Sequence, residues 1–476
     1  MRLGRAAPHA VRLGSGGALV VGNDTGGCVR DNSVLTEAWS RWDADDFGWI
    51  SNTDLDDPRA DFAVVTLLDG RVLSIGGVDR GNTPAMYRLT ATDQEPPADA
   101  GHRSIASTYV YDPAADEPDW VRVASLGTPR TGPSAVALLD GRVLVAGGYY
   151  LGGSATGTGT GSAVALAVYR TSPPTGAATP GPVLDNDGPP PNIVPAMATA
   201  ELYDPSTDTW SATGPMRYAR YEAVAATLAD GRVLVIGSGG TGDQWLRWNF
   251  SEIEVADRTY VTAEIYEPGT GRFGLTGALP PIDWSALETL GVGDPEVTTS
   301  SRPMDQGTLI ALADGGALLV GRTSEWWAYG DGHESQGVIV RTLRFEPVTG
   351  SWSEIDRTIE IVWADTQLTG VVSQGHVSYR PLVGRLGDGR VLVAGGQHMS
   401  GPDHLVALET AELYDPDADS WTALPPMPEH RAGGAAVTLG DGSVLLVGGY
   451  YETRQSWDCS EGPTGLVSTV RFVPGP

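Results

Sequence analysis

The stretch TAELYDPSTDTW at residues 199–210 returns almost unchanged as TAELYDPDADSW at residues 410–421. Each copy precedes a methionine, an arginine four residues after that methionine, and two apolar runs that lead to a glycine. The second of these apolar runs occurs seven times in the 476-residue chain. Internal repetition of this kind is typical of propellers and solenoids, in which each repeat forms one structural unit.

The two apolar runs of each repeat predict a tight hairpin. Six of the seven pairs are joined through Asp-Gly, which supplies the positive φ angles that a short turn needs. A third strand is predicted to end at the Tyr-Asp-Pro triplet, because proline cannot donate to a strand ladder. A fourth strand is predicted to begin at an aromatic residue in five repeats: Trp120, Trp210, Phe273, Trp352 and Trp421. Four strands in each of seven repeats predict an all-β, seven-bladed β-propeller that occupies residues 1–476 as one domain.

The last repeat differs from the others at its outer edge. Its third strand is expected at Ser468–Pro474, and Met1 and Arg5 have the spacing of Met427 and Arg431. The seventh blade is therefore predicted to be three-stranded or to be completed from the N-terminal side. An unpaired strand edge at this blade could recruit another chain.

The double glycine after the second strand, the Tyr-Asp-Pro triplet and the tryptophan some six residues later resemble the kelch-repeat family, which includes the central domain of galactose oxidase. The resemblance implies the propeller fold and two catalytic alternatives, a copper radical oxidase similar to galactose oxidase and a carbohydrate enzyme similar to the sialic-acid mutarotases. The oxidase would need a Tyr-His pair, and the sequence has no Tyr-His dipeptide. Because no catalytic motif is recognisable either, we predict a non-catalytic recognition or scaffold protein.

The composition restricts the partners. The chain has 59 acidic and 31 basic side chains, with a net charge of −28, which argues against nucleic acid and anionic membranes. No apolar run is long enough to span a membrane. A protein or a glycan is therefore the expected partner.

The two cysteines, Cys28 and Cys459, fall in equivalent loops of the first and last repeats. These repeats are neighbours in a closed ring, so the pair predicts a disulfide, with two unrelated thiols as the alternative. A disulfide favours an extracellular or cell-surface location, and a cytoplasmic location is the alternative.

The loops between second and third strands are long, and in a propeller they emerge on one face together with the connections between repeats. The two largest segments of that face are residues 149–198 and 274–306. Long loops on a rigid scaffold are common binding sites. The ligand-binding candidates are aromatic residues of these loops, which could instead pack the loops against one another: Tyr149, Trp245, Trp248, Trp326, Trp327, Tyr450 and Trp457.

Polar candidates lie on the same face. An arginine lies near the entry to each first strand: Arg5, Arg59, Arg130, Arg220, Arg302, Arg380 and Arg431. Of these, Arg220 and Arg431 are the candidates that could bind an anion or could pair with a carboxylate of the scaffold. Histidines also gather in two loops and beside a first strand, namely His333, His376, His398 and His404. Their spacing is not diagnostic of a metal site, and the acidic loop at residues 43–54 matches a calcium loop only in part. We therefore predict no cofactor, with copper or calcium as the alternatives.

Overall fold

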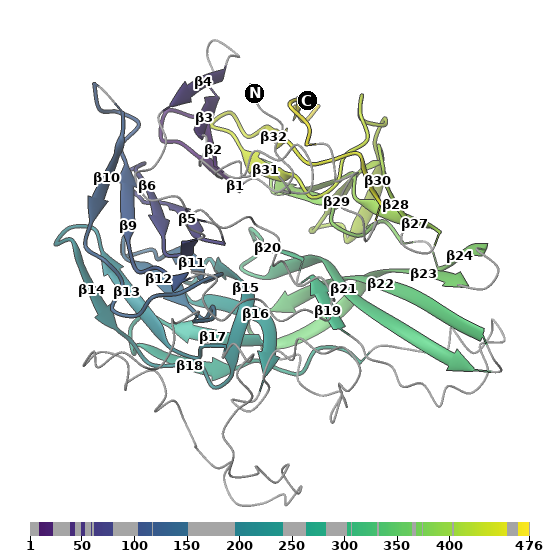
Figure 1. The fold of residues 1–476 in the computed structure, drawn as a ribbon, viewed down its shortest axis with the longest axis horizontal. Coiled ribbons are helices and arrows are strands. Elements are labelled where there is room, and N and C mark those ends of the chain that lie inside the picture. Colours follow the sequence, from purple (N-terminus) through teal and green to yellow (C-terminus); the bar gives the residue numbers. More distant parts are fainter. Residues whose placement is uncertain are drawn as a thin grey trace, which may run out of the picture.

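The computed structural model describes residues 9–21, 39–42, 49–52, 59, 61–79, 103–116, 118–150, 196–240, 263–281, 302–305, 307–330, 333–363, 368–373, 375–401, 404–454 and 465–475. These residues form strands and turns, and none of them is helical. Figure 1 shows the sheets arranged around a common centre, with the sheets of the first and last repeats side by side.

Five sheets are four-stranded and antiparallel, and the chain crosses each of them from the innermost strand outward. The first and second repeats form the sheets β1(His9–Arg12), β2(Ala18–Val21), β3(Trp39–Trp42) and β4(Trp49–Asn52), and β5(Ala63–Thr66), β6(Val72–Ile75), β9(Thr108–Tyr111) and β10(Trp120–Val123). The third and fourth repeats form β11(Ser134–Ala137), β12(Val143–Ala146), β13(Ala200–Asp204) and β14(Thr209–Ala212), and β15(Ala219–Thr227), β16(Val233–Gly240), β17(Ala263–Glu267) and β18(Arg272–Leu275). The sixth repeat forms β25(Leu382–Arg385), β26(Val391–Ala394), β29(Ala411–Asp415) and β30(Ser420–Ala423).

The fifth repeat forms a larger sheet of six strands. Its blade consists of β20(Thr308–Ala311), β21(Ala317–Gly330), β22(His333–Glu346) and β23(Ser351–Trp363), and β19(Arg302–Asp305) and β24(Leu368–Ser373) are added to it. Strands β21 and β22 are each 14 residues long, whereas the inner strands of most other blades have four. The second-to-third strand connection of this repeat is therefore itself a long hairpin.

The last repeat forms a three-stranded sheet of β31(Ala435–Thr438), β32(Val444–Val447) and β34(Thr469–Phe472). The prediction of seven four-stranded blades is thus wrong in its count, because six blades have four strands. The described residues that follow β34 are irregular and include Pro474, which cannot donate to a ladder.

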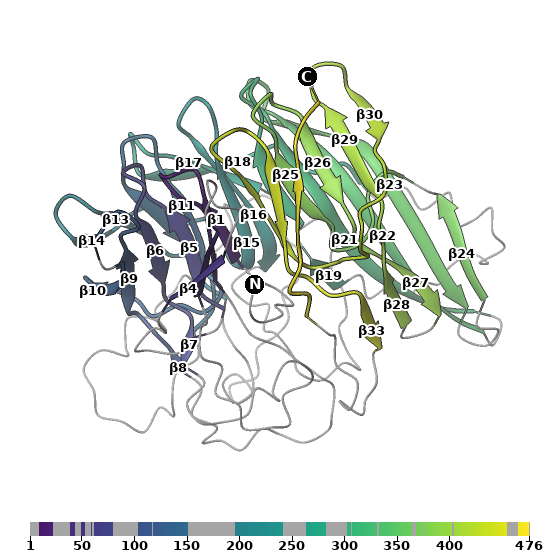
Figure 2. The ribbon, with the colours of Figure 1, turned by 90° about the horizontal axis from the view of Figure 1, so that it is seen from above.

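Two further small sheets come from connections between second and third strands. They are the pair β7(Val78–Asp79) and β8(Arg103–Ser104), and the three strands β27(Gln397–Gly401), β28(His404–Ala407) and β33(Glu452–Arg454). Strand β33 of the last repeat pairs with β28 of the sixth repeat, so this sheet links the two repeats. Figure 2 shows both small sheets on the same side of the ring.

Each sheet packs face to face on the next through its own apolar cluster. The first and last repeats also share one, in which Ala18 and Val20 contact Val437, Leu439 and Leu445. The second strands in these clusters, such as β2, β6 and β12, are fully buried at every position. Burial on both faces explains why the sequence has continuous apolar runs instead of an alternating pattern.

The hairpin turns meet at the centre of the ring. Each turn glycine has a positive φ, between 83° and 99°, as the Asp-Gly pattern predicts. The residue that precedes Asp-Gly packs on the glycine of the next turn, and this contact recurs seven times around the ring: Gly14 on Gly70, Leu68 on Gly141, Leu139 on Gly231, Ala229 on Gly315, Ala313 on Gly389, Gly387 on Gly442 and Gly440 on Gly16. The sheets of the first and last repeats are therefore held at the turns as well as through their shared core.

Gly440→Ala is expected to destabilise the ring. A Cβ at this position would lie 2.8 Å from the Cα of Gly16, and the Gly440 amide donates to the Gly16 carbonyl at 3.0 Å. Because both sides of the contact are backbone, we expect the free energy of unfolding in urea to fall by about 1–3 kcal/mol. Gly269→Ala is the control, since no atom lies within 4 Å of a Cβ there. Equal stability of the two variants would contradict this role of the turns.

The outer strands are joined by a pair of aromatic rings. Tyr203 and Trp210 pack with ring centroids 5.0 Å apart, and Tyr414 and Trp421 do the same at 5.0 Å. The Tyr414 hydroxyl also donates to Asp419 Oδ1 at 2.7 Å. Burial, together with this carboxylate, raises the pKa of Tyr414 to about 12. The Tyr-Asp-Pro triplet thus fixes the turn between third and fourth strands.

Tyr414→Phe is expected to change the alkaline stability profile. The unfolded phenol ionises near pH 10, whereas the folded one ionises at a pKa of about 12. The stabilising effect of the protonated phenol is therefore fully present below about pH 10 and is lost as the pH rises through about 12. Urea unfolding between these pH values should show a shallower loss of stability for the variant. A loss as steep as that of the unsubstituted protein would count against it.

Candidate functional site

The two faces of the ring are built differently. One face, here called the turn face, carries the inner hairpin turns and the short turns between third and fourth strands. The opposite face, here called the long-loop face, carries the two small sheets, as Figure 2 shows. The far ends of β21 and β22 belong to the same kind of connection. The described structure thus concentrates additional strands on one face.

Four arginines that precede the first strands are buried in the scaffold: Arg59, Arg130, Arg220 and Arg431. Each donates through Nη1 to a glycine carbonyl at the end of the second strand of its own repeat, at 3.0–3.2 Å. Arg130 also pairs with Glu201 at 2.9 Å and Arg220 with Glu264 at 3.0 Å. Burial lowers the pKa of both guanidinium groups, and the facing carboxylates oppose that shift.

Arg220 and Arg431 were the two anion-binding candidates. Both are instead held by contacts within the scaffold, which was the alternative interpretation of these arginines. Both side chains have no exposed surface, and Arg431 donates to Ser468 Oγ at 2.9 Å. The Glu264 carboxylate that holds Arg220 also accepts from the Arg217 amide at 2.7 Å. The arginine of each repeat thus ties the first strand to the second and third.

The position two residues after this arginine has an unusual backbone in several repeats. It has a positive φ in four described repeats, at Asp61 (50°), Gly132 (58°), Arg380 (53°) and Gly433 (63°). In the sixth repeat, which contains Arg380, Ser378 stands in place of the arginine. Positive φ suits glycine, and it is strained for most other residues. Two repeats therefore hold a charged residue where glycine would be easier to accommodate.

The residue after the double glycine decides which side chain fits at this position. Tyr149 and Tyr450 lie over Gly132 and Gly433, and a Cβ on Gly433 would be 2.7 Å from the Tyr450 ring. The equivalent residues of the repeats that contain Asp61 and Arg380 are Val78 and Gln397, neither of which is aromatic. Asp61 and Arg380 thus occur in the two repeats that do not have a tyrosine directly after the double glycine.

Arg380 is held by aromatic side chains. Its Nε donates to the Tyr379 hydroxyl at 3.0 Å, and its Nη1 donates to the Tyr450 hydroxyl at 3.2 Å. The guanidinium also lies over the Tyr379 ring, 5.3 Å from its centroid. The Tyr450 hydroxyl reaches Gln397 Oε1 at 3.2 Å. The guanidinium is therefore fixed in one orientation by residues of the sixth and seventh repeats.

The aromatic candidates have different positions. Tyr450 is 4% exposed and belongs to the support of Arg380, and Tyr149 lies beside Thr131 through an isolated bridge. Trp326 and Trp327 lie in β21, where their backbones pair with Gly337 and Gln336. Trp245, Trp248 and Trp457 lie outside the described residues.

The histidine candidates do not gather into one site in the described part of the chain. His376 pairs with Glu412 and stacks on Trp421 at 4.9 Å. His398 lies in β27, whereas His333 and His404 are placed only by their backbones, in β22 and β28. The described residues contain no group of three or more histidine, cysteine, aspartate or glutamate side chains that could hold a metal ion. Cys28, Cys459 and most of the acidic loop lie outside them.

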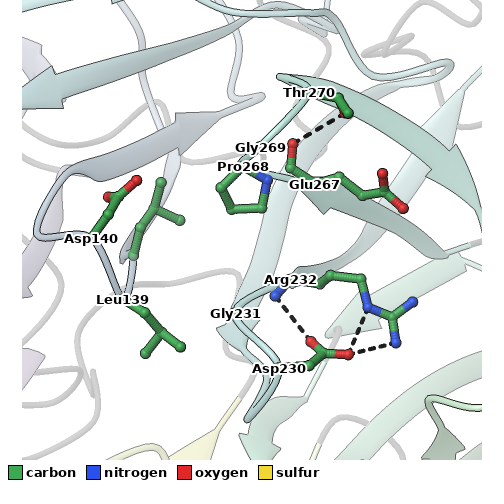
Figure 3. Close-up of a pocket in the computed structure, with 10 residues that line it drawn as sticks. Leu139, Asp140, Asp230, Gly231, Arg232, Glu267, Pro268, Gly269 and Thr270 are labelled. Atoms are coloured by element: carbon green, nitrogen blue, oxygen red, sulfur yellow. Dashed lines mark hydrogen bonds and ion pairs between the residues drawn. The ribbon is translucent and has the colours of Figure 1, made fainter.

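A shallow cavity of about 380 Å³ lies on the turn face between the third and fourth repeats (Figure 3). Leu139 and Asp140 line one side of it, and the turn with Asp230 and Arg232 lines another. The two aspartates pair with the arginines of their own turns, at 2.6 Å and 2.7 Å. The charged groups of the two turns are thus already paired within their own hairpins.

Sequence reasoning missed Asp61, and it considered Arg380 only as one of the seven arginines near the first strands. The signal that could have found them is a comparison of the repeats, since Gly132 and Gly433 occupy the equivalent positions. The strain itself is a property of φ, which the residue type alone does not reveal.

A ring of antiparallel four-stranded sheets joined through inner hairpins defines the chain as a β-propeller protein. The kelch motif matches residues 386–428. Galactose oxidase of Gibberella zeae is 25% identical over 246 residues, which cover 52% of this chain and 28% of that protein. Kelch-like protein terF of Aspergillus terreus is 27% identical over 179 residues, which cover 37% of this chain and 33% of that protein. The chain therefore carries a kelch motif and is similar in sequence to these two proteins.

The matched segments span a third or less of the length of these relatives. Among solved structures, the chain is similar to one named "Structure of YjhT", with 12% sequence identity, a TM-score of 0.44, and coverage of 88% of this chain and 96% of that chain. In the described part of the chain, no helix has the length and apolar character of a membrane span.

Glu264→Ala is expected to destabilise the fold strongly. It removes the partner of a fully buried guanidinium, so we expect the free energy of unfolding to fall by about 3–5 kcal/mol. Asp230→Ala, which removes an exposed ion pair of similar length, should lower it by no more than about 1 kcal/mol. Urea or thermal unfolding of both variants tests the contrast. Similar losses would mean that the buried pair is not essential to the scaffold.

Proposed function

We propose that this propeller is a non-catalytic recognition protein that binds a protein or glycan partner on its long-loop face. The observation that carries the proposal is the positive φ of Asp61 and Arg380. Strain of this kind costs on the order of 1–3 kcal/mol per residue and is concentrated at functional sites. Because glycine serves at the same position in other repeats, the two charged side chains are retained against an easier alternative.

The support of Arg380 agrees with a recognition role. Two tyrosine hydroxyls and a tyrosine ring fix the guanidinium in place. A pre-oriented side chain loses little conformational entropy when a partner binds. Trp326 and Trp327 of β21 are proposed as further contacts, because rigid aromatic residues are frequent anchors at protein and sugar interfaces.

Galactose oxidation is the second candidate function, and the similarity to a protein named galactose oxidase favours it. A copper centre would need ligands that the described residues do not gather. A carbohydrate enzyme similar to the sialic-acid mutarotases is a further alternative, and it too would use the long-loop face. If the predicted disulfide between Cys28 and Cys459 forms, the partner would be an extracellular or cell-surface molecule.

Arg380→Gly is expected to separate stability from binding. Glycine adopts the same φ without strain, and this gain offsets the lost hydrogen bonds to Tyr379 and Tyr450, so the free energy of unfolding in urea should change by no more than about 1 kcal/mol. Its affinity for the ligand found by screening a glycan panel and a peptide panel should fall at least about tenfold, because the oriented cation is lost.

Asp419→Gly is the matched control. It also replaces a residue with a positive φ, of 47°, but it lies on the turn face and accepts the Tyr414 hydroxyl. This variant should lose stability and keep its affinity. If Arg380→Gly binds as tightly as the unsubstituted protein, the proposed site is wrong. If copper-loaded protein oxidises galactose with turnover, the proposal of a non-catalytic protein is wrong.

A further inference from the structure

The third strands of the other six blades can be compared with β34, the third strand of the last sheet. In each blade the third strand places an aromatic residue opposite the first residue of the second strand, as Tyr203 lies opposite Val143 and Tyr414 opposite Val391. Phe472 of β34 lies opposite Val444 in the same register. Phe472 is therefore the equivalent of Tyr203 and Tyr414 in the sheet of the last repeat.

Every four-stranded blade places a second aromatic residue opposite the first. The register pairs are Trp42 with Trp49, Tyr111 with Trp120, Tyr203 with Trp210, Tyr266 with Phe273, Phe345 with Trp352, and Tyr414 with Trp421. Where the rings are described, their centroids are 4.8–5.3 Å apart. The aromatic residue on the third strand is at most 2% exposed in these five blades.

Phe472 does not have this partner among the described residues. The described part of β34 pairs with β32 alone, and the Phe472 ring is partly exposed. Val473, the next residue, is 60% exposed. Among the described residues, the last sheet thus has no strand paired with the outer edge of β34, at the place where six blades have a matching strand.

We propose that this edge binds an extended segment of another polypeptide that carries a tryptophan or phenylalanine opposite Phe472. The chemistry of the segment follows from the strands that do this within the ring, such as TWSA in β14 and SWTA in β30, where the aromatic residue is followed by small or polar residues. The bound strand would add backbone hydrogen bonds to the sheet and one aromatic pair.

A second copy of β34 does not fit this template. If two antiparallel β34 strands placed Phe472 opposite Phe472, Val470 of one strand would face Pro474 of the other. Proline cannot donate to the ladder at that point. A self-paired edge would therefore be short, whereas a segment with the β30 pattern could pair along the whole strand.

The test uses the whole chain and a fluorescein-labelled peptide with the sequence DADSWTAL, which corresponds to residues 417–424. Fluorescence anisotropy should show saturable binding. Binding should be at least about tenfold weaker for the peptide with alanine in place of tryptophan, and at least about tenfold weaker for the Phe472→Ala protein. Val348→Ala is the control, because Val348 is 90% exposed and lies in the fifth repeat.

Hydrogen exchange makes the test independent of the stability of the Phe472→Ala protein. Amide exchange in β34 of the unsubstituted chain should slow when the tryptophan peptide is added and should not slow with the alanine peptide. Equal binding of the two peptides would overturn the proposal. So would β34 amides that are fully protected without peptide, since another part of the chain would then cover the edge. A dimer in sedimentation that Phe472→Ala dissociates would identify a second copy as the occupant and would also overturn it. Because this edge is separate from the long-loop face, none of these results bears on the function proposed above.

Discussion

The contact between successive hairpin turns constrains the rest of this molecule. The residue before each Asp-Gly packs on the glycine of the next turn, so the space between two sheets at the centre depends on one side chain. Glycine at Gly387 and Gly440 lets backbones touch and hydrogen-bond, whereas the Leu139 side chain packs on Gly231 and lines the cavity of Figure 3. A sheet that twists by a fixed hand can close into a ring only if these spacings are compatible around the centre.

In four described repeats, a buried arginine has a comparable role. It links the start of the first strand to the glycine carbonyl of the second strand, and in two repeats to a glutamate of the third. A buried guanidinium without these acceptors would be strongly destabilising, so the arginine and its partners must be kept together. The arginines therefore help to hold the backbone that places the neighbouring positive-φ residues on the long-loop face.

Function and scaffold are separated between the two faces. On the turn face, the ion pairs of the turns, such as Asp140 with Arg142, are formed within single hairpins and leave few unpaired charges in the described residues. On the long-loop face, additional strands and two strained charged residues occupy positions that the ring does not require for closure. The proposals rest on residues whose surroundings differ from those in the other repeats. These are Asp61 and Arg380 on this face and Phe472 at the edge of the last sheet.

The sequence by itself determined the strand order and the turns. Asp-Gly specifies a hairpin and Tyr-Asp-Pro ends a strand through local backbone chemistry, so these elements are found where the sequence predicts them. The count of seven four-stranded blades was wrong, since six are observed, whereas the alternative of a three-stranded last blade agrees with the described sheet of β31, β32 and β34. Only the tertiary structure decided that Arg220 is buried against Glu264 and that Arg380 has a positive φ. Both depend on side chains from strands far apart in the sequence, and residue type alone does not reveal such contacts.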